Sequence, residues 1–223
     1  MIDFESFPLP LLILFALFVV LIVLVEVRVL TYAYRKIGVH PRYAFAVLLL
    51  SLIGSLKDIP LFQIGPAGPA QTSGATLVAL NVGGALIPIL VSIYLVARTR
   101  MYVRMLIATA AVAALVHSLA RVVPGAGIAV PIFVPPLVAA AVALLLAFRR
   151  APPVAYVAGS MGTLIGADLL NLHKVQGLGA PVASIGGAGT FDGIFLTGIL
   201  AVLLASMFSQ PVRRRMGTMQ APR

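Results

Sequence analysis

The chain has 223 residues, of which 61% are hydrophobic and only 10% are charged, and its formal net charge is +10. An ordinary globular domain is about 25% charged, so this composition excludes a water-soluble domain and predicts an integral membrane protein. The absence of cysteine from the sequence excludes disulfides, thiolate metal sites and cysteine nucleophiles.

Seven apolar runs follow one another along the chain, and a bilayer crossing takes about 20 residues. They predict an all-α, polytopic helix bundle with about seven spans, forming a single transmembrane domain over residues 1–223. The second run is short, so it begins earlier than its apolar core, or it lies tilted and partly re-entrant. The runs cover residues 8–30, 43–57, 75–97, 103–122, 126–148, 153–172 and 190–209.

The first run resembles the apolar core of a signal peptide, but its flanks differ. Asp3 and Glu5 make the N-terminal flank acidic, and no small-residue cleavage site follows the run. Signal peptides have a basic flank and such a site. We therefore expect an uncleaved first helix, with Glu26 either snorkelling to the interface near its inner end or pairing with a neighbouring base.

The basic residues predict the orientation of the bundle. With the N-terminus outside and seven alternating spans, thirteen of the sixteen Lys and Arg residues fall on the cytoplasmic side. Only Lys57, Arg121 and Lys174 fall outside. This asymmetry follows the positive-inside rule and predicts an outside N-terminus, a cytoplasmic C-terminus and residence in the cytoplasmic (inner) membrane. The asymmetry also accounts for the positive net charge, so we do not expect nucleic acid as a partner.

Glycine and proline interrupt the apolar pattern. The connections at residues 64–74 and 177–189 are rich in Gly, Pro, Ala and Ser, which break helices but allow the chain to fold back onto the protein. Pro88 interrupts the third run, and the fifth carries three prolines at positions 131, 135 and 136. These breaks indicate either a kinked, packed bundle or helices that line a cavity. Gly162 and Gly166 are spaced for close helix approach.

Three acids are expected at one depth near the outer surface. Asp58 follows the second run, Asp168 lies one turn inside the sixth, and Asp192 lies one turn inside the seventh. Because the sixth and seventh runs are antiparallel neighbours, Asp168 and Asp192 are expected to face one another and to share a proton. Such a pair activates water or carries protons. This is the candidate catalytic pair.

Other polar residues are expected at the same level as supporting or substrate-binding groups. Asn81 lies near the outer start of the third run, and Asn171 is three residues beyond Asp168. His117 and Arg121 are four apart, which puts them on one face of a helix. Each is alternatively a packing residue with a satisfied hydrogen bond. The histidines lack zinc-motif spacing, so no metal site and no cofactor are expected.

Two long segments resemble a known family. GTLIGADLLNL and GAPVASIGGAGTFDGIFLTGILAVLLA are similar to the signature of the domain of unknown function 1614 family of bacterial and archaeal membrane proteins. The resemblance extends to ALNVGGALIPILVSIYL and RVVPGAGIAVPIFVPPLVAA, and so covers most of the chain after about Leu50. It implies a prokaryotic inner-membrane protein and brings no established activity.

A second, local resemblance concerns the approach to Asp192. Gly187, Gly189 and Gly193 surround it in a sequence similar to the Gly-x-Gly-Asp element of intramembrane aspartyl proteases of the presenilin, signal-peptide-peptidase and prepilin-peptidase kind. Here two residues separate Gly189 from Asp192, where the protease motif has none, and the Pro-Ala-Leu element of those proteases is missing. The resemblance implies an aspartyl hydrolase with Asp168 as the partner acid.

The sequence leaves three functions open. The first is an intramembrane aspartyl hydrolase that acts on a transmembrane peptide, in which Asp168 and Asp192 activate water. The second is a proton- or cation-coupled carrier or channel for an ion or small solute, which uses the same acids. The third is a non-catalytic membrane scaffold or assembly factor whose polar cluster only fixes helix packing. The lipid bilayer is the one partner common to all three.

Overall fold

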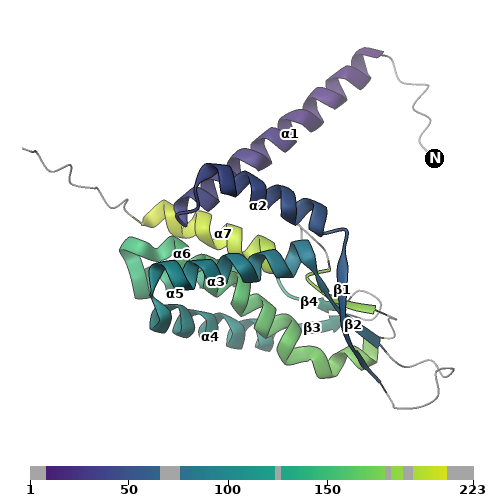
Figure 1. Cartoon of the computed structure of the whole chain (residues 1–223), viewed down its shortest axis with the longest axis vertical. Helices are drawn as coiled ribbons and strands as arrows, with labels where there is room; N and C mark the ends of the chain where they lie inside the picture. The colour runs from purple at the N-terminus through teal and green to yellow at the C-terminus, as the bar shows by residue number, and fades with distance from the viewer. Residues whose placement is uncertain (1–8, 66–75, 124–126, 179–181, 188–192, 210–223) are drawn as a thin grey trace, which may run out of the picture.

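The computed structural model describes residues 9–65, 76–123, 127–178, 182–187 and 193–209. Most of these residues are helical, and the helices form a bundle with small strands gathered at one of its ends (Figure 1). The helices are α1 (Leu9–Lys36), α2 (Pro41–Gly54), α3 (Ile87–Thr99), α4 (Tyr102–Leu119), α5 (Val134–Ala147), α6 (Ala151–Thr163) and α7 (Gly193–Phe208).

Four short segments extend or join these helices. Two are π-helical turns: η2 (Val82–Leu86) leads into α3, and η4 (Leu164–Asp168) continues α6. Two are 3-10 segments: η3 (Phe148–Arg150) joins α5 to α6, and η5 (Leu169–Leu178) follows η4. Single π turns inside helices occur frequently at functional sites, so η2 and η4 mark two candidate positions for such a site.

Prolines lie where a helix begins or where its geometry changes. Pro88, Pro135 and Pro152 occupy the first turns of α3, α5 and α6. Backbone N–H groups in a first helical turn have no partner in the helix, so a residue without an N–H is tolerated there. In the third run, Pro88 lies where the π-helical turn η2 passes into α3 within the helical stretch Val82–Thr99. In the fifth run, the helix begins only at Val134, so Pro135 and Pro136 lie in its first turn and not in its interior.

Strands correct the expectation of an all-α chain. β1 (Asp58–Ile64), β2 (Thr76–Asn81) and β5 (Val182–Ile185) form a sheet of order β1-β2-β5, in which β2 is antiparallel to β1 and parallel to β5. β3 (Arg121–Val123) and β4 (Gly127–Ala129) form a separate antiparallel pair.

These strands shorten three of the expected spans. The third apolar run starts as β2, and the fourth ends in β3 because α4 stops at Leu119. The fifth run starts as β4, and its helix begins only at Val134. Gly- and Pro-rich sequence lies next to these strands, and helix propensity is low there. Apolar sequence alone does not distinguish a short buried strand from the end of a helix.

Several helices are long and apolar enough to cross a membrane. Among the residues that the structure describes, they are the stretches Val82–Thr99, Tyr102–Leu119 and Val134–Lys174, and Gly193–Phe208 is a shorter apolar helix. The stretch from Val134 turns at η3, where Ala147 and Arg150 leave helical geometry, and α6 packs back against α5. These helices indicate a membrane protein. Seven spans and their orientation remain predictions.

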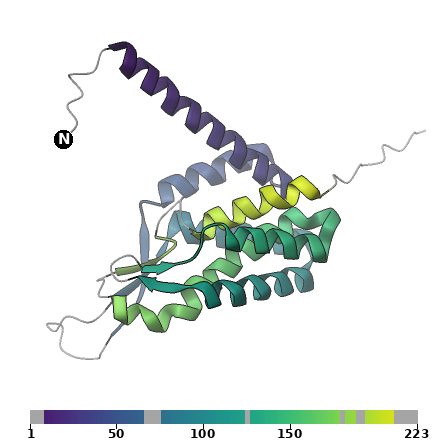
Figure 2. The same cartoon turned by 180° about the vertical axis from the view of Figure 1, so that it is seen from behind.

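The core is built around α6. Every residue from Ala151 to Ser160 is buried, because α6 packs against α3, α4, α5 and α7 (Figures 1 and 2). Glycines make this packing close: a Cβ at Gly162 would lie 2.6 Å from the Val112 side chain of α4, and one at Gly166 would lie 2.5 Å from the Ala113 carbonyl oxygen. The close approach predicted for these two glycines is confirmed.

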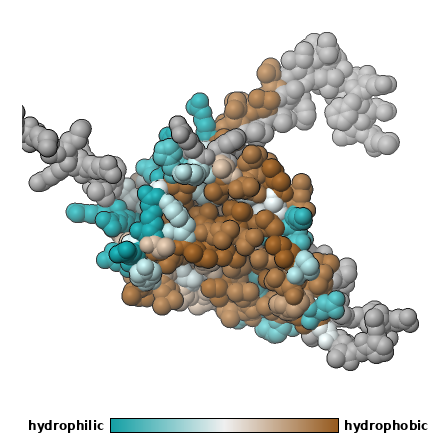
Figure 3. Space-filling model, in the orientation of Figure 1, coloured by the Kyte–Doolittle hydropathy of each residue, from teal (hydrophilic) through white to brown (hydrophobic). Residues whose placement is uncertain are grey.

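The surface shows a broad apolar face bordered by hydrophilic residues. Figure 3 shows this apolar area across the bundle, with polar residues gathered toward its two ends. α1 projects from the bundle (Figures 1 and 2); its last turns are buried at Ala33 and Tyr34, whereas Leu17, Leu21 and Leu24 are each more than half exposed. A lipid environment would cover this apolar surface, which water does not favour.

Candidate functional site

Of the predicted acid pair, the structure describes Asp168 and not Asp192. Asp168 is the last residue of the π-helical turn η4 and is half-buried. Asp192 and Gly189 lie outside the described residues, so a pairing of Asp168 with Asp192 remains a prediction. Gly193 begins α7 and is exposed, and a Cβ there would lie 3.8 Å from the Thr163 methyl group.

Buried hydroxyl groups lead along α6 toward Asp168. Tyr156, Ser160 and Thr163 follow one another at spacings of four and three residues, which places them on one face of the helix. All three side chains are at most 4% exposed. From Tyr156 to Thr163 the helix rises about 10 Å, and Asp168 follows Thr163 by a single π-helical turn.

Tyr34 of α1 extends this row at its other end. Its ring lies 6.1 Å from the ring of Tyr156, and both side chains are fully buried. The hydroxyls of Tyr34 and Ser160 lie near enough to the Tyr156 hydroxyl to interact with it electrostatically. We call the four residues Tyr34, Tyr156, Ser160 and Thr163 the hydroxyl column.

The hydroxyl column makes no well-formed hydrogen bond within the described parts of the chain, although the hydroxyls of Tyr34, Tyr156 and Ser160 lie close enough to interact with one another. The oxygen atoms of all four side chains are buried and make no hydrogen bond of acceptable geometry there. Ser92 of α3 and Ser206 of α7 have buried hydroxyls in the same condition. A buried hydroxyl without a partner costs roughly 1–3 kcal/mol, and the contacts among Tyr34, Tyr156 and Ser160 offset part of that cost, so the column has hydrogen-bonding capacity left for a further polar group.

A second polar group ties the three-stranded sheet together. The Asn81 amide donates hydrogen bonds to the Asp58 carboxylate (2.9 Å) and to the Ser55 carbonyl (2.9 Å), and its oxygen accepts one from the Gly84 N–H (2.8 Å). The Ser184 hydroxyl donates to the same Asp58 oxygen (2.7 Å). Asp58 is exposed, Asn81 is buried, and each residue comes from a different strand.

This Asp58–Asn81–Ser184 cluster has the character of a structural joint. Asn81 uses both its donors and its acceptor inside the protein, and its side-chain oxygen caps η2. A residue so engaged has little capacity left for a ligand. The structure thus brings together two predicted site residues, Asp58 and Asn81, and adds Ser184, which was not expected.

Asn171 closes the end of η4. It is fully buried, and its amide donates to the carbonyl oxygens of Gly166 (2.8 Å) and Ala167 (2.9 Å). Lys174 in turn donates to the Asn171 side-chain oxygen (2.7 Å). Carbonyls freed by a π-helical turn need such partners inside a membrane, so Asn171 and Lys174 hold the turn that carries Asp168.

His117 and Arg121 do not share a helical face. α4 ends at Leu119, and Arg121 begins β3, where its side chain is exposed. The expectation for this pair is wrong because the chain turns from helix to strand between them. His117 is half-buried, and its Nδ1 is buried with no partner among the described residues. Gly187 is exposed in the turn after β5, directly after Gly186, whose φ is +71°.

The described residues contain no cluster of potential metal ligands. Within the described residues, no three His, Asp or Glu side chains are arranged to hold a metal ion. The hydroxyl column, together with Ser92, Ser206 and the Nδ1 atom of His117, supplies the buried polar atoms that make no well-formed hydrogen bond among the described residues. Asp168 is half-buried.

Comparison with known proteins gives one match. The model of the family described as "Protein of unknown function (DUF1614)" matches residues 57–204, which is about two thirds of the chain. The chain belongs to this DUF1614 family. Searches of curated proteins and of solved structures returned no match.

The DUF1614 match confirms the family resemblance seen in the sequence and fixes its extent. It begins just before Asp58 and ends inside α7, so it includes both π-helical turns, the sheet and most of the hydroxyl column. α1, which contributes Tyr34, lies before the matched region. The match carries no activity, and the protease resemblance and the prokaryotic origin remain predictions.

Sequence analysis missed the hydroxyl column, although a signal for it was present. The spacing of Tyr156, Ser160 and Thr163 marks one face of a helix, and Asp168 follows Thr163 by five residues. Hydroxyls are common in membrane helices, so their residue types alone do not distinguish this row. Their lack of partners becomes visible only when the neighbouring helices are in place.

Proposed function

We propose that this DUF1614 protein is a membrane carrier or channel for protons or small cations, with a path that follows the hydroxyl column to Asp168. The observation that supports this is the row of buried hydroxyls between α6 and its neighbours, in which Tyr34, Tyr156 and Ser160 interact with one another but none makes a well-formed hydrogen bond among the described residues. A hydroxyl donates one hydrogen bond and accepts others, so consecutive hydroxyls can pass a proton or coordinate a dehydrated cation.

The chemistry of the two ends suits such a path. Asp168 supplies a carboxylate that can bind a proton or a cation near one end of α6. Tyr34 and Tyr156 lie toward the opposite end, near the turn at η3. The column is closed in this structure, since all four side chains are buried. Transport would therefore require the helices around α6 to separate, and π-helical turns are frequent where helices change shape.

The carrier would reside in the cytoplasmic membrane as a multi-pass protein, with its N-terminus outside and its basic face toward the cytoplasm. This orientation follows from the distribution of Lys and Arg. Asp168 would then lie near the outer surface, and Tyr34 near the inner one. The hydrolase hypothesis relies on Asp192, which the structure does not describe, and no contact of a described residue favours it over transport.

The test is flux through the purified protein in proteoliposomes, read with a pH-sensitive dye or a cation-sensitive dye under an imposed gradient. Wild type is expected to carry protons or a monovalent cation. Asp168→Asn and Ser160→Ala are expected to lower that flux at least tenfold. Ser118→Ala is the matched control, because Ser118 is exposed and its hydroxyl already donates to the Leu115 carbonyl.

Two results would contradict the proposal. One is the absence of flux for protons and common cations in wild-type proteoliposomes. The other is an unchanged flux in both Ser160→Ala and Asp168→Asn. The scaffold hypothesis predicts instead that Asp168→Asn combined with Asp192→Asn lowers thermal stability and changes no flux. The hydrolase hypothesis predicts cleavage of transmembrane reporter peptides that is lost in Asp192→Asn.

A further inference from the structure

A pocket lies at the opposite end of α6 from Asp168. Its volume is about 340 Å³, and it is formed where α5 turns into α6 beside the start of α4. Its walls are Arg104, Leu146, Ala147, Phe148, Arg149 and Arg150. Half of these residues are arginines.

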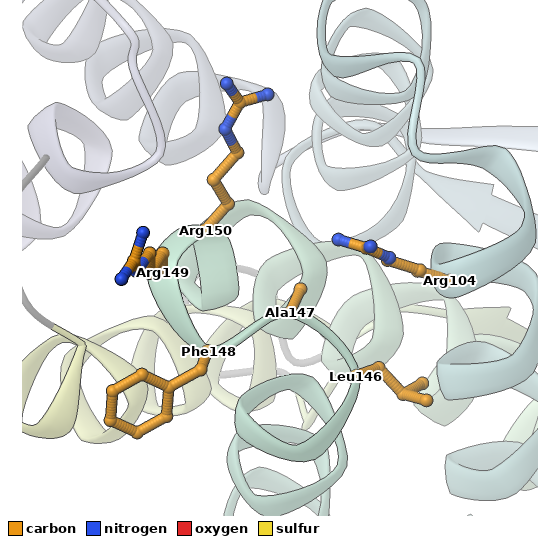
Figure 4. Close-up of a pocket in the computed structure, with 6 residues that line it drawn as sticks. All are labelled: Arg104, Leu146, Ala147, Phe148, Arg149 and Arg150. Carbon is orange, nitrogen blue, oxygen red and sulfur yellow. The ribbon is translucent and has the colours of Figure 1, made fainter.

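The arginines come from two separate parts of the fold. Figure 4 shows Arg104 extending from α4 toward the turn at Ala147, while Arg150 extends from the turn itself. Arg149 and Phe148 point away from Arg104 in this view. All three arginines are exposed. The pocket thus presents guanidinium groups from α4 and from the α5–α6 turn around one space.

The guanidinium groups of the pocket lack partners among the described residues, whereas Arg98 and Lys36 each contact a tyrosine ring. Arg98 donates a hydrogen bond to the Tyr94 hydroxyl and lies 5.6 Å from the centre of its ring, and Lys36 lies 5.1 Å from the Tyr32 ring. By contrast, Arg104, Arg149 and Arg150 make no hydrogen bond or ion pair with any residue that the structure describes. The N–H donors of these arginines are therefore available for charge-assisted hydrogen bonds to a ligand.

The chemistry of the pocket fits a phosphate group. An arginine offers a planar fork of N–H donors that binds phosphate oxygens in pairs. The N-terminus of α4, which starts two residues before Arg104, has no side-chain cap, and unpaired N–H groups at a helix start favour an anion nearby. Nothing acidic lines the pocket. A dianionic or monoanionic phosphate ester would complement these charges.

The apolar neighbours point to a lipid as one source of that phosphate. Phe148, which is part of the pocket wall, is 51% exposed, and Leu145, next to the wall residue Leu146 in the sequence, is 85% exposed. Apolar side chains beside a basic pocket allow a headgroup to bind while acyl chains cover the helix surface. The same arginines would also admit a soluble phosphorylated compound from the aqueous side.

We propose that this arginine pocket is a binding site for a phosphate ester, with the headgroup of an anionic phospholipid and a soluble phosphate as its two sources. The proposal does not depend on transport through the hydroxyl column. It goes beyond the general positive-inside asymmetry, because it assigns binding to Arg104 and Arg150 and not to every base on the same face.

The test measures the thermal unfolding midpoint of the full-length protein in a non-ionic detergent. Dihexanoyl phosphatidylglycerol, dihexanoyl phosphatidylcholine and sodium phosphate are titrated separately. A ligand that binds only the folded state raises the midpoint with its concentration. We expect phosphatidylglycerol to raise the wild-type midpoint by several degrees, and phosphatidylcholine to raise it much less. A rise with sodium phosphate as well would identify a site open to soluble phosphates, and its absence would identify a lipid site.

Two double variants and one control test whether the pocket causes the rise in the unfolding midpoint. Arg104→Gln combined with Arg150→Gln is expected to remove most of the rise, and Arg98→Gln, the control on the same face, is expected to keep it. Arg104→Lys combined with Arg150→Lys preserves the net charge and is expected to lose the larger part of the rise, because lysine lacks the fork. A rise that is equal in wild type and both double variants would overturn the proposal. So would equal rises with the two lipids, or no rise at all.

Discussion

Gly198 of α7 lies directly against the hydroxyl of Ser160 on α6: a Cβ at position 198 would overlap the Ser160 Oγ atom. The same Cβ would lie 3.3 Å from the Tyr156 ring. The close packing of α7 on the hydroxyl column therefore depends on a glycine at this position. Small residues at helix interfaces allow this approach inside membranes.

The first prediction concerns this contact. Gly198→Ala is expected to destabilise the protein by about 1–3 kcal/mol, because the added methyl group overlaps the Ser160 hydroxyl and crowds the Tyr156 ring, so either Ser160 must rotate or α6 and α7 must move apart. Gly193→Ala is the matched control: Gly193 is exposed, and a Cβ there makes only ordinary contact with Thr163 at 3.8 Å. The measurement is reversible unfolding in mixed micelles.

Combining the change with Ser160→Ala sharpens the first prediction. Ser160→Ala removes the atom that the new methyl group would meet, so Gly198→Ala should cost less in that background than alone. Neighbouring residues that share a contact show such non-additive effects. Equal costs of Gly198→Ala in both backgrounds would show that Ser160 does not set the spacing of the two helices.

The second prediction concerns the sheet joint. Asn81→Ala is expected to lower the free energy of unfolding by about 2–3 kcal/mol, because it leaves the buried Gly84 N–H and the Ser55 carbonyl without their side-chain partner. Ser184→Ala removes one exposed hydrogen bond to Asp58 and should cost less than about 1 kcal/mol. Chemical denaturation of both variants checks the ranking. Similar small effects for both would contradict the role given to Asn81.

The third prediction concerns the π-helical turn beneath Asp168. Asn171→Leu keeps the approximate side-chain size but removes the donor to the Gly166 and Ala167 carbonyls, so about 1–3 kcal/mol of stability should be lost. Lys174→Met removes only the bond to the Asn171 oxygen and should be milder. If η4 supports transport, Asn171→Leu should also reduce flux, whereas Lys174→Met should leave most of it. Proteoliposome flux and unfolding are measured on the same preparations.

The fourth prediction concerns orientation. The sequence contains no cysteine, so single cysteines can be introduced without a background. Leu56→Cys, at a position that is 89% exposed beside β1, should react with a membrane-impermeant maleimide on intact cells. Tyr102→Cys, at the start of α4, should react only after the cells are opened. The reverse pattern would invert the predicted topology.

The sequence determined the membrane character of the protein, because apolar composition and length act through the bilayer and need no knowledge of the fold. It also indicated the family and the close approach at Gly162 and Gly166, since a spacing of four residues repeats on one helix face.

Tertiary structure decided which polar residues meet and which have partners. Asp58, Asn81 and Ser184 come together only because β1, β2 and β5 pair across long stretches of sequence. Arg121 was predicted to lie on a helix but begins β3, because an apolar run does not show where a helix ends and a strand begins. The unpartnered hydroxyls of Ser160 and Thr163 became visible only with α7 and α4 packed around α6, since a hydrogen-bond deficit depends on neighbours and not on residue type.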